Sequence, residues 1–70
     1  MVERRKARRR FAVCVFNEGY EASLECDKVY PVLSDPRAER DGDLRIVDES
    51  GEDYLYPAEW FVARPREARP

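Results

Sequence analysis

The chain has 70 residues, which is short for a domain and excludes a second independently folding unit. It contains no histidine and only two cysteines, which excludes the commonest general base, the usual protease dyads and most zinc sites. The formal net charge is −2, and no apolar run approaches the length of a membrane span or of a signal peptide. We therefore expect one soluble, cytoplasmic domain that is not an enzyme and binds no cofactor, metal or membrane.

The first ten residues form a basic arm with a net charge of +5, whereas residues 11–70 carry −7. Clustered arginines neutralise phosphates and release counterions from nucleic acid. The candidate nucleic-acid-binding residues are therefore Arg4, Arg5, Lys6, Arg8, Arg9 and Arg10. The arm can equally be a disordered, solubilising extension that folds back onto the acidic body. The sequence leaves both interpretations open.

Residues 11–16 (FAVCVF) are rich in β-formers and predict the first strand. Both alternating sets of side chains are apolar, which predicts a strand covered on both faces. Residues 20–26 have no clear period and contain one aliphatic side chain, Leu24. We therefore expect a loop that Leu24 holds to the core. The thiols of Cys14 and Cys26 are expected to be free, because small disulfide-held domains usually carry more cysteines.

Residues 28–33 predict the second strand, with Tyr30 and Val32 on one face. Pro31 has no backbone N–H to donate to a ladder, which indicates an edge or a bulge. Residues 34–42 are polar and rich in turn formers, and they predict a solvated connection that can include one helical turn.

Residues 44–48 and 53–56 flank a four-residue connection with glycine, which is typical of a β-hairpin. The acidic residues in and around this connection are expected to be solvated, and they do not match a calcium-binding loop. Pro57 suits the first position of a helical or 3-10 turn over residues 57–60. Residues 61–63 then predict a last strand. Residues 64–70 contain two prolines and no apolar period, which predicts a disordered tail.

Five short strands with a turn before the last one predict an all-β fold. Residues 54–62 (YLYPAEWFV) resemble the closing segment of SH3 domains, and residues 28–33 (KVYPVL) are similar to their second strand. The run from Phe11 to Val62 also resembles small bacterial proteins of uncharacterised function. The resemblance implies a small five-stranded SH3-like barrel over residues 11–63, without implying an activity.

In the SH3 comparison, Pro57 and Trp60 correspond to the proline and the aromatic residue of the closing turn that help to line the ligand groove. Two other parts of that groove are missing. The first strand lacks the family's tyrosine-bearing pattern, and Asp43-Leu44 stands where its tryptophan pair would begin. The resemblance therefore does not imply a conventional proline-rich ligand.

A small barrel needs large side chains in its core, so we expect Tyr30 and Phe16 to be buried. Of Tyr54, Tyr56 and Trp60, no more than two are expected to be exposed. An exposed aromatic cluster would mark a protein contact site.

The sequence thus favours a noncatalytic interaction module that binds a protein or peptide, or self-associates as a homo-oligomer, through an aromatic face near Trp60. The candidate binding residues are Tyr54, Tyr56, Pro57 and Trp60. The alternative is a nucleic-acid-binding accessory protein, whose basic arm supplies affinity while exposed rings, including that of Tyr20, stack on bases.

Overall fold

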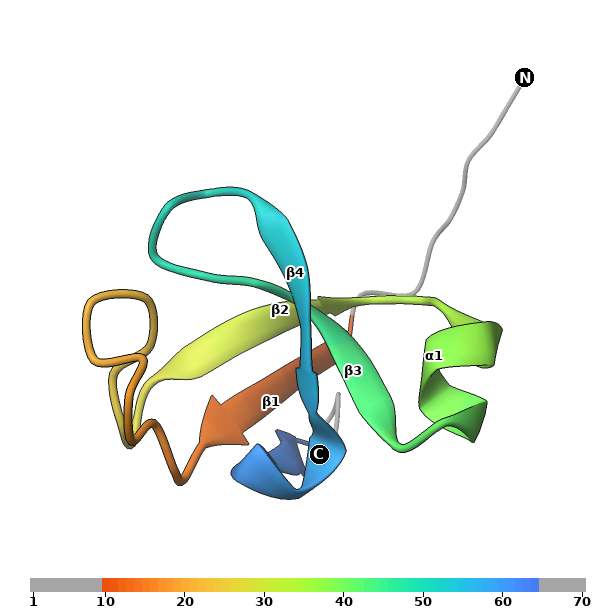
Figure 1. The fold of residues 1–70 in the computed structure, drawn as a ribbon, viewed down its shortest axis with the longest axis horizontal. Coiled ribbons are helices and arrows are strands. Elements are labelled where there is room, and N and C mark those ends of the chain that lie inside the picture. The colour runs from red at the N-terminus through yellow and green to blue at the C-terminus, as the bar shows by residue number, and fades with distance from the viewer. Residues whose placement is uncertain (1–9, 65–70) are drawn as a thin grey trace, which may run out of the picture.

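The computed structural model of the protein describes residues 10–64. Five antiparallel strands form one sheet, and helices are limited to two short segments, so the prediction of an all-β protein is confirmed (Figure 1). The elements in chain order are β1 (Arg10–Cys14), β2 (Val29–Leu33), helix α1 (Pro36–Arg40), β3 (Asp43–Val47), β4 (Asp53–Pro57), the 3-10 helix η1 (Ala58–Trp60) and β5 (Phe61–Arg64).

The strand order in the sheet is β4-β3-β2-β1-β5, so the last strand returns to pair with the first. Strands β4 and β5 lie at opposite edges, yet only the three residues of η1 connect them. In a flat sheet these edges would be about 19 Å apart, at roughly 4.8 Å per strand. Three residues span no more than about 11 Å. The sheet therefore curls strongly, although no ladder joins β4 to β5 within residues 10–64, so it is not closed.

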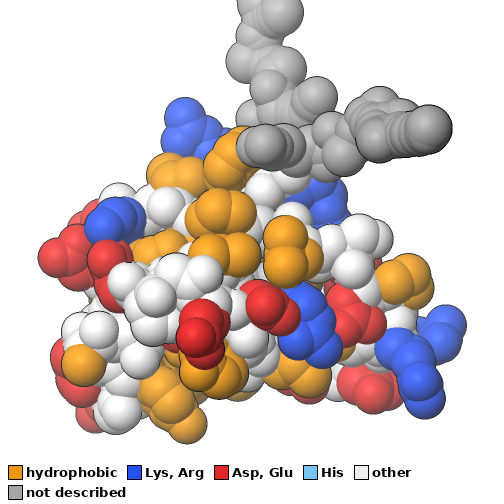
Figure 2. All heavy atoms as spheres, turned by 90° about the horizontal axis from the view of Figure 1, so that it is seen from above, with side chains coloured by type: hydrophobic (Ala, Val, Ile, Leu, Met, Phe, Trp, Pro, Cys, Tyr) orange, Lys and Arg blue, Asp and Glu red, His pale blue; other side chains and the backbone are white. Residues whose placement is uncertain are grey.

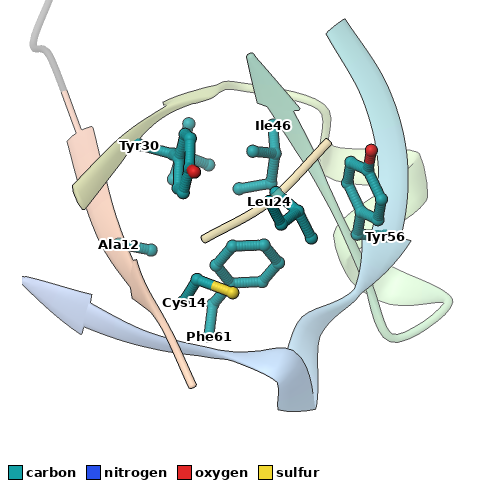
Figure 3. Close-up of a cluster of buried hydrophobic side chains, with 8 residues drawn as sticks. Ala12, Cys14, Leu24, Tyr30, Ile46, Tyr56 and Phe61 are labelled. Atoms are coloured by element: carbon teal, nitrogen blue, oxygen red, sulfur yellow. The ribbon is translucent and has the colours of Figure 1, made fainter. Parts of the chain in front are cut away.

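The curled sheet surrounds a core of alternate side chains from its strands (Figure 3). Leu24 enters this core from the loop between β1 and β2 and is fully buried, so the predicted role of this side chain is confirmed. The prediction that Tyr30 is buried is also confirmed. The buried cluster consists of Ala12, Cys14, Leu24, Tyr30, Val32, Ile46, Tyr56 and Phe61.

The first strand is shorter than expected, because β1 ends at Cys14. Phe16 lies beyond its end and is 42% exposed, so the prediction that Phe16 is buried is wrong. Both faces of the first strand were expected to be buried, but only one face of β1 is. Ala12 is buried in the core, whereas Phe11 and Val13 are partly exposed on the outer face. No other element of the described chain packs over that outer face as a second layer.

The predicted hairpin is confirmed, with β3 and β4 pairing in a register that runs from Asp43 opposite Pro57 to Val47 opposite Asp53. Gly51 has a φ of 87° in the connecting turn, a conformation that favours glycine. Strand β2 lies inside the sheet, but its ladder to β3 begins at Val32. Pro31 therefore lies outside the β2–β3 ladder, and this ladder requires no backbone N–H from Pro31.

Helix α1 occupies part of the polar connection in which a helical turn was predicted. It begins after Asp35, whose Oδ1 atom accepts a hydrogen bond from the Ala38 N–H at 3.1 Å, and Pro36 fills the first turn. The predicted turn before the last strand is also present, as η1. Among residues 10–64 no helix has both the length and the hydropathy required to cross a membrane.

The termini of the described chain lie in the sheet. Arg10 and Arg64 belong to the predicted arm and the predicted tail, but they are the first residue of β1 and the last residue of β5. The rest of the predicted arm and tail, residues 1–9 and 65–70, falls outside the described residues.

Candidate functional site

Aromatic side chains gather where the loop over residues 15–28 meets β4 and η1. The Tyr20 ring lies between two others, with its centroid 5.7 Å from that of Tyr56 and 5.4 Å from that of Trp60. Phe16 lies beside Trp60, with 5.2 Å between the ring centroids. These contacts join side chains from distant parts of the sequence into one surface. We call this surface the aromatic face. It comprises the contacting rings of Phe16, Tyr20, Tyr56 and Trp60, and Tyr54, which lies two residues before Tyr56 on β4.

The sequence-predicted binding residues differ in their accessibility. Tyr54 is 50% exposed, whereas Tyr56 is buried and Trp60 is partly buried. The expectation that no more than two of these three rings are exposed is therefore confirmed. Pro57 is partly buried at the end of β4 and contributes no ring to the aromatic face.

Two exposed members of the aromatic face, Phe16 and Tyr20, were not among the residues chosen for protein binding. Tyr20 follows directly after Asn17-Glu18-Gly19, and a ring placed next to such a turn is a candidate for the surface. This position next to a turn is the sequence feature that could have identified Tyr20 as a surface residue. The sequence around Phe16 instead indicates burial, because residues 11–16 form an apolar run that is typical of a buried strand.

A hollow of about 410 Å³ opens beside Tyr20. Its walls come from the loop over residues 15–28, from the hairpin turn over residues 48–52 and from β4. Because three of its side chains are tyrosines, we call it the tyrosine hollow. It is lined by Tyr20, Ser23, Asp48, Ser50, Tyr54, Leu55 and Tyr56.

The loop and the hairpin turn are held together by hydrogen bonds around Glu49. The Glu49 N–H donates to the Ser23 carbonyl at 2.9 Å. The Glu49 carboxylate accepts from the Tyr30 hydroxyl at 2.6 Å and from the Lys28 ammonium at 2.7 Å. Lys28, and then Tyr30, lowers the pKa of the Glu49 carboxyl group by these hydrogen bonds. Hydrogen bonds within the chain therefore hold the two walls of the tyrosine hollow relative to each other.

Asp48 lies at the base of the hairpin turn and is 6% exposed, so the expectation of a solvated acid at this position is wrong. Its Oδ1 atom accepts hydrogen bonds from the Ser50 hydroxyl at 2.6 Å and from the Ser50 N–H at 2.9 Å. Its Oδ2 atom accepts from the Tyr56 hydroxyl at 2.6 Å. These donors compensate for the burial of the carboxylate.

The pKa values of Asp48 and Tyr56 follow from this arrangement. Burial acts to raise the pKa of Asp48, but the hydrogen bonds from Ser50 and Tyr56 outweigh it and leave the pKa below its usual value. Burial, and then the hydrogen bond to Asp48, raises the pKa of Tyr56 to about 12. At neutral pH the pair is therefore a carboxylate and a protonated phenol.

A second, smaller hollow of about 250 Å³ lies on the other side of Trp60, lined by Phe16, Glu59 and Trp60. Tyr20 contacts both Tyr56 and Trp60, so the two hollows are neighbours along one surface. A ligand that covered both hollows would contact two loops, a strand and η1.

The described residues do not form a basic surface. Residues 10–64 contain 6 basic and 13 acidic side chains, a net charge of −7. On the face shown in Figure 2, acidic, basic and hydrophobic side chains are interspersed. Arg10 is the one residue of the predicted nucleic-acid-binding set in the described chain, and its guanidinium pairs with Glu39 at 2.6 Å. Arg4, Arg5, Lys6, Arg8 and Arg9 lie outside the described residues, so nucleic-acid binding by the arm stays a prediction from the sequence.

Metal-ligating and cysteine side chains were the remaining candidates for reactive groups in the described residues. Within residues 10–64, no three histidine, cysteine, aspartate or glutamate side chains are grouped as metal ligands. Cys14 and Cys26 form no disulfide, as expected. Burial raises the pKa of the Cys14 thiol, which disfavours the reactive thiolate.

Comparison with protein-family models, curated proteins and solved structures finds no match to this chain. The relationship to small bacterial SH3-like proteins therefore stays a prediction from the sequence. The class that the fold and the site define is a small all-β protein with an exposed aromatic surface.

Proposed function

We propose that this protein is a noncatalytic interaction module that binds an extended protein or peptide segment through the aromatic face. The observation that carries the proposal is the exposure of large rings around Trp60 and Tyr56. Phe16 and Tyr20 both contact Trp60, and Tyr54 lines the tyrosine hollow together with Tyr20 and Tyr56. Phe16, Tyr20 and Tyr54 are all between 42% and 50% exposed, although a chain of this size has few large apolar side chains for its core. Exposed aromatic clusters beside hollows are the usual anchors of protein interfaces.

The proposal includes an SH3-like barrel architecture. It is supported by the strand order β4-β3-β2-β1-β5, by the pairing of the first strand with the last and by η1 between β4 and β5. The long loop between β1 and β2 then borders the binding surface together with η1. The aromatic face uses Tyr20 from this loop and Trp60 from η1, and Trp60 is one of the two residues that the resemblance assigns to the ligand groove.

Rigid walls favour binding by this surface. The loop that carries Tyr20 is fixed by internal hydrogen bonds, including one from the Asn17 side chain to the Leu24 carbonyl at 2.8 Å. The Ser23 and Leu24 N–H groups both donate to the Tyr20 carbonyl at 2.9 Å. Because these hydrogen bonds within the chain hold the loop, binding costs little additional conformational entropy.

The test uses the full chain to select ligands from a random peptide library, with affinities measured by the fluorescence of Trp60, the single tryptophan. We expect Trp60→Ala and Tyr20→Ala to weaken peptide binding at least about tenfold, as truncation of aromatic anchors does. Affinities of the Trp60 variant are measured by calorimetry. The matched control is Val62→Ala, since Val62 is 54% exposed on β5 and lines neither hollow.

Far-ultraviolet circular dichroism of each variant establishes that the fold is retained. A set of folded variants in which every exposed aromatic side chain can be replaced without loss of binding would refute the proposal. If the bound segment is a second copy of the chain, sedimentation of the protein alone reports a dimer that Tyr20→Ala dissociates.

A further inference from the structure

The tyrosine hollow contains a buried negative charge without a positive partner in the described chain. The ion pairs formed among residues 10–64 use other acids: Glu39, Glu49, Asp35 and Asp53. The partners of Asp48 are the neutral donors Ser50 and Tyr56. A buried charge is costly unless it is paired or fully hydrogen-bonded. Asp48 is hydrogen-bonded, but its charge has no counterpart among these residues.

From this we propose that the tyrosine hollow receives a lysine or arginine side chain of the bound segment, next to Asp48. The inference rests on the proposed function and names the chemistry of its partner. A carboxylate has about four acceptor positions, and three hydrogen bonds to Asp48 are formed. Two of these are at Oδ1 and one is at Oδ2, so Oδ2 retains the capacity to accept a further donor.

The other walls of the hollow suit a cation as well. The faces of tyrosine rings attract ammonium and guanidinium groups, and the two exposed tyrosines of the hollow, Tyr20 and Tyr54, supply such rings. The Tyr54 hydroxyl donates to the Glu52 carboxylate at 3.0 Å, so a second acid lies next to one of the tyrosines that line the hollow. Long cationic side chains also have apolar stems that can cover Leu55.

The same features disfavour the other classes of ligand. A phosphate or carboxylate group would face the Asp48 charge at close range and be repelled. A purely apolar side chain would remove water from the mouth of the hollow without supplying a donor for Asp48. A cationic side chain satisfies both the carboxylate and the rings.

The experiment begins with a peptide selected on the full chain, as described above. Its affinity is compared with that of versions in which one arginine is replaced by citrulline, or one lysine by norleucine. Citrulline keeps the shape of arginine and removes its charge. For the residue that enters the hollow, we expect the charged peptide to bind at least about tenfold more tightly, comparable to a truncated interface anchor.

The contribution of Asp48 is measured by repeating both titrations with Asp48→Asn. We expect the ratio of the two affinities to fall towards one, because the variant removes the charge and keeps a similar shape. Partial loss of folding would lower both affinities and leave the ratio unchanged, so the ratio separates the two effects. The matched control is Glu59→Gln, which removes an acid from the neighbouring hollow and is expected to preserve the ratio.

Two results would overturn this inference while leaving the proposed function intact. One is a peptide that depends on Trp60 but binds equally well with every cationic residue neutralised. The other is a charge preference that Asp48→Asn does not reduce. The absence of any peptide that depends on the aromatic face would instead refute the proposed function itself.

Discussion

Replacing Leu24 with alanine is expected to lower the free energy of unfolding by about 3 kcal/mol, within the range for large-to-small core substitutions. Leu24 has no exposed surface and is the one core side chain from the loop between β1 and β2 (Figure 3). A single small core supplies only about 3–5 kcal/mol of net stability. The substitution therefore removes most of the stability of the protein.

Urea unfolding followed by circular dichroism and by Trp60 fluorescence measures this effect. The matched control is Leu55→Ala, because Leu55 is 46% exposed on β4 and loses little burial on truncation. We expect the control to cost less than about 1 kcal/mol. Equal losses for the two variants would mean that Leu24 does not hold the loop to the core.

The Leu24 substitution also has a functional consequence. The Leu24 N–H donates to the carbonyl of Tyr20, and the Leu24 carbonyl accepts from Asn17. A loop released from the core would no longer hold the Tyr20 ring against Tyr56 and Trp60. Stabilising the folded variant with an osmolyte should therefore restore secondary structure more completely than peptide affinity.

The second large effect is expected at alkaline pH, where the protein should lose about 3 kcal/mol of stability between about pH 10 and about pH 12. The pKa of Tyr56 is raised to about 12 in the folded protein, from 10.0 for an ordinary tyrosine. A group whose pKa is higher in the folded state stabilises that state fully below its unfolded pKa. The contribution is lost as the pH rises through the folded pKa. Each pKa unit corresponds to about 1.4 kcal/mol.

The raised pKa of Tyr30 is also expected to reduce stability at alkaline pH. Burial, followed by the hydrogen bond to Glu49, raises the pKa of its hydroxyl group above the ordinary value. Ionisation of either phenol would place a second negative charge beside a carboxylate, against Asp48 for Tyr56 and against Glu49 for Tyr30. Alkaline unfolding should therefore release both loop and hairpin turn together.

Urea titrations at neutral pH and at several alkaline values measure the loss, and phenolate absorbance reports ionisation. The informative variant is Tyr56→Phe, which should be less stable than the parent at neutral pH because Asp48 loses a donor. Its stability should also fall less steeply above about pH 10, since the raised pKa of Tyr56 no longer contributes. An alkaline decline as steep as that of the parent would show that Tyr56 is not responsible.

The sequence alone determined the class of the fold and most of its local elements. The hairpin of β3 and β4 follows from apolar residues on both sides of a glycine-containing connection, and η1 follows from the proline at position 57. Leu24 was predictable because it is the single aliphatic side chain in a polar loop. These features depend on neighbours in the chain, where residue type and spacing carry the information.

The tertiary structure decided what the candidate site is made of. Phe16 belongs to an apolar run that reads as a buried strand, but β1 ends two residues before it and its ring packs on Trp60 at the surface. Asp48 belongs to an acidic turn that reads as solvated, but the loop that carries Tyr20 and Ser23 lies against that turn and covers it. These outcomes depend on contacts between residues far apart in the sequence, Phe16 with Trp60 and Ser23 with Glu49. Local sequence patterns do not predict such contacts, because the burial of a residue depends on what packs against it in space and not on its neighbours in the sequence.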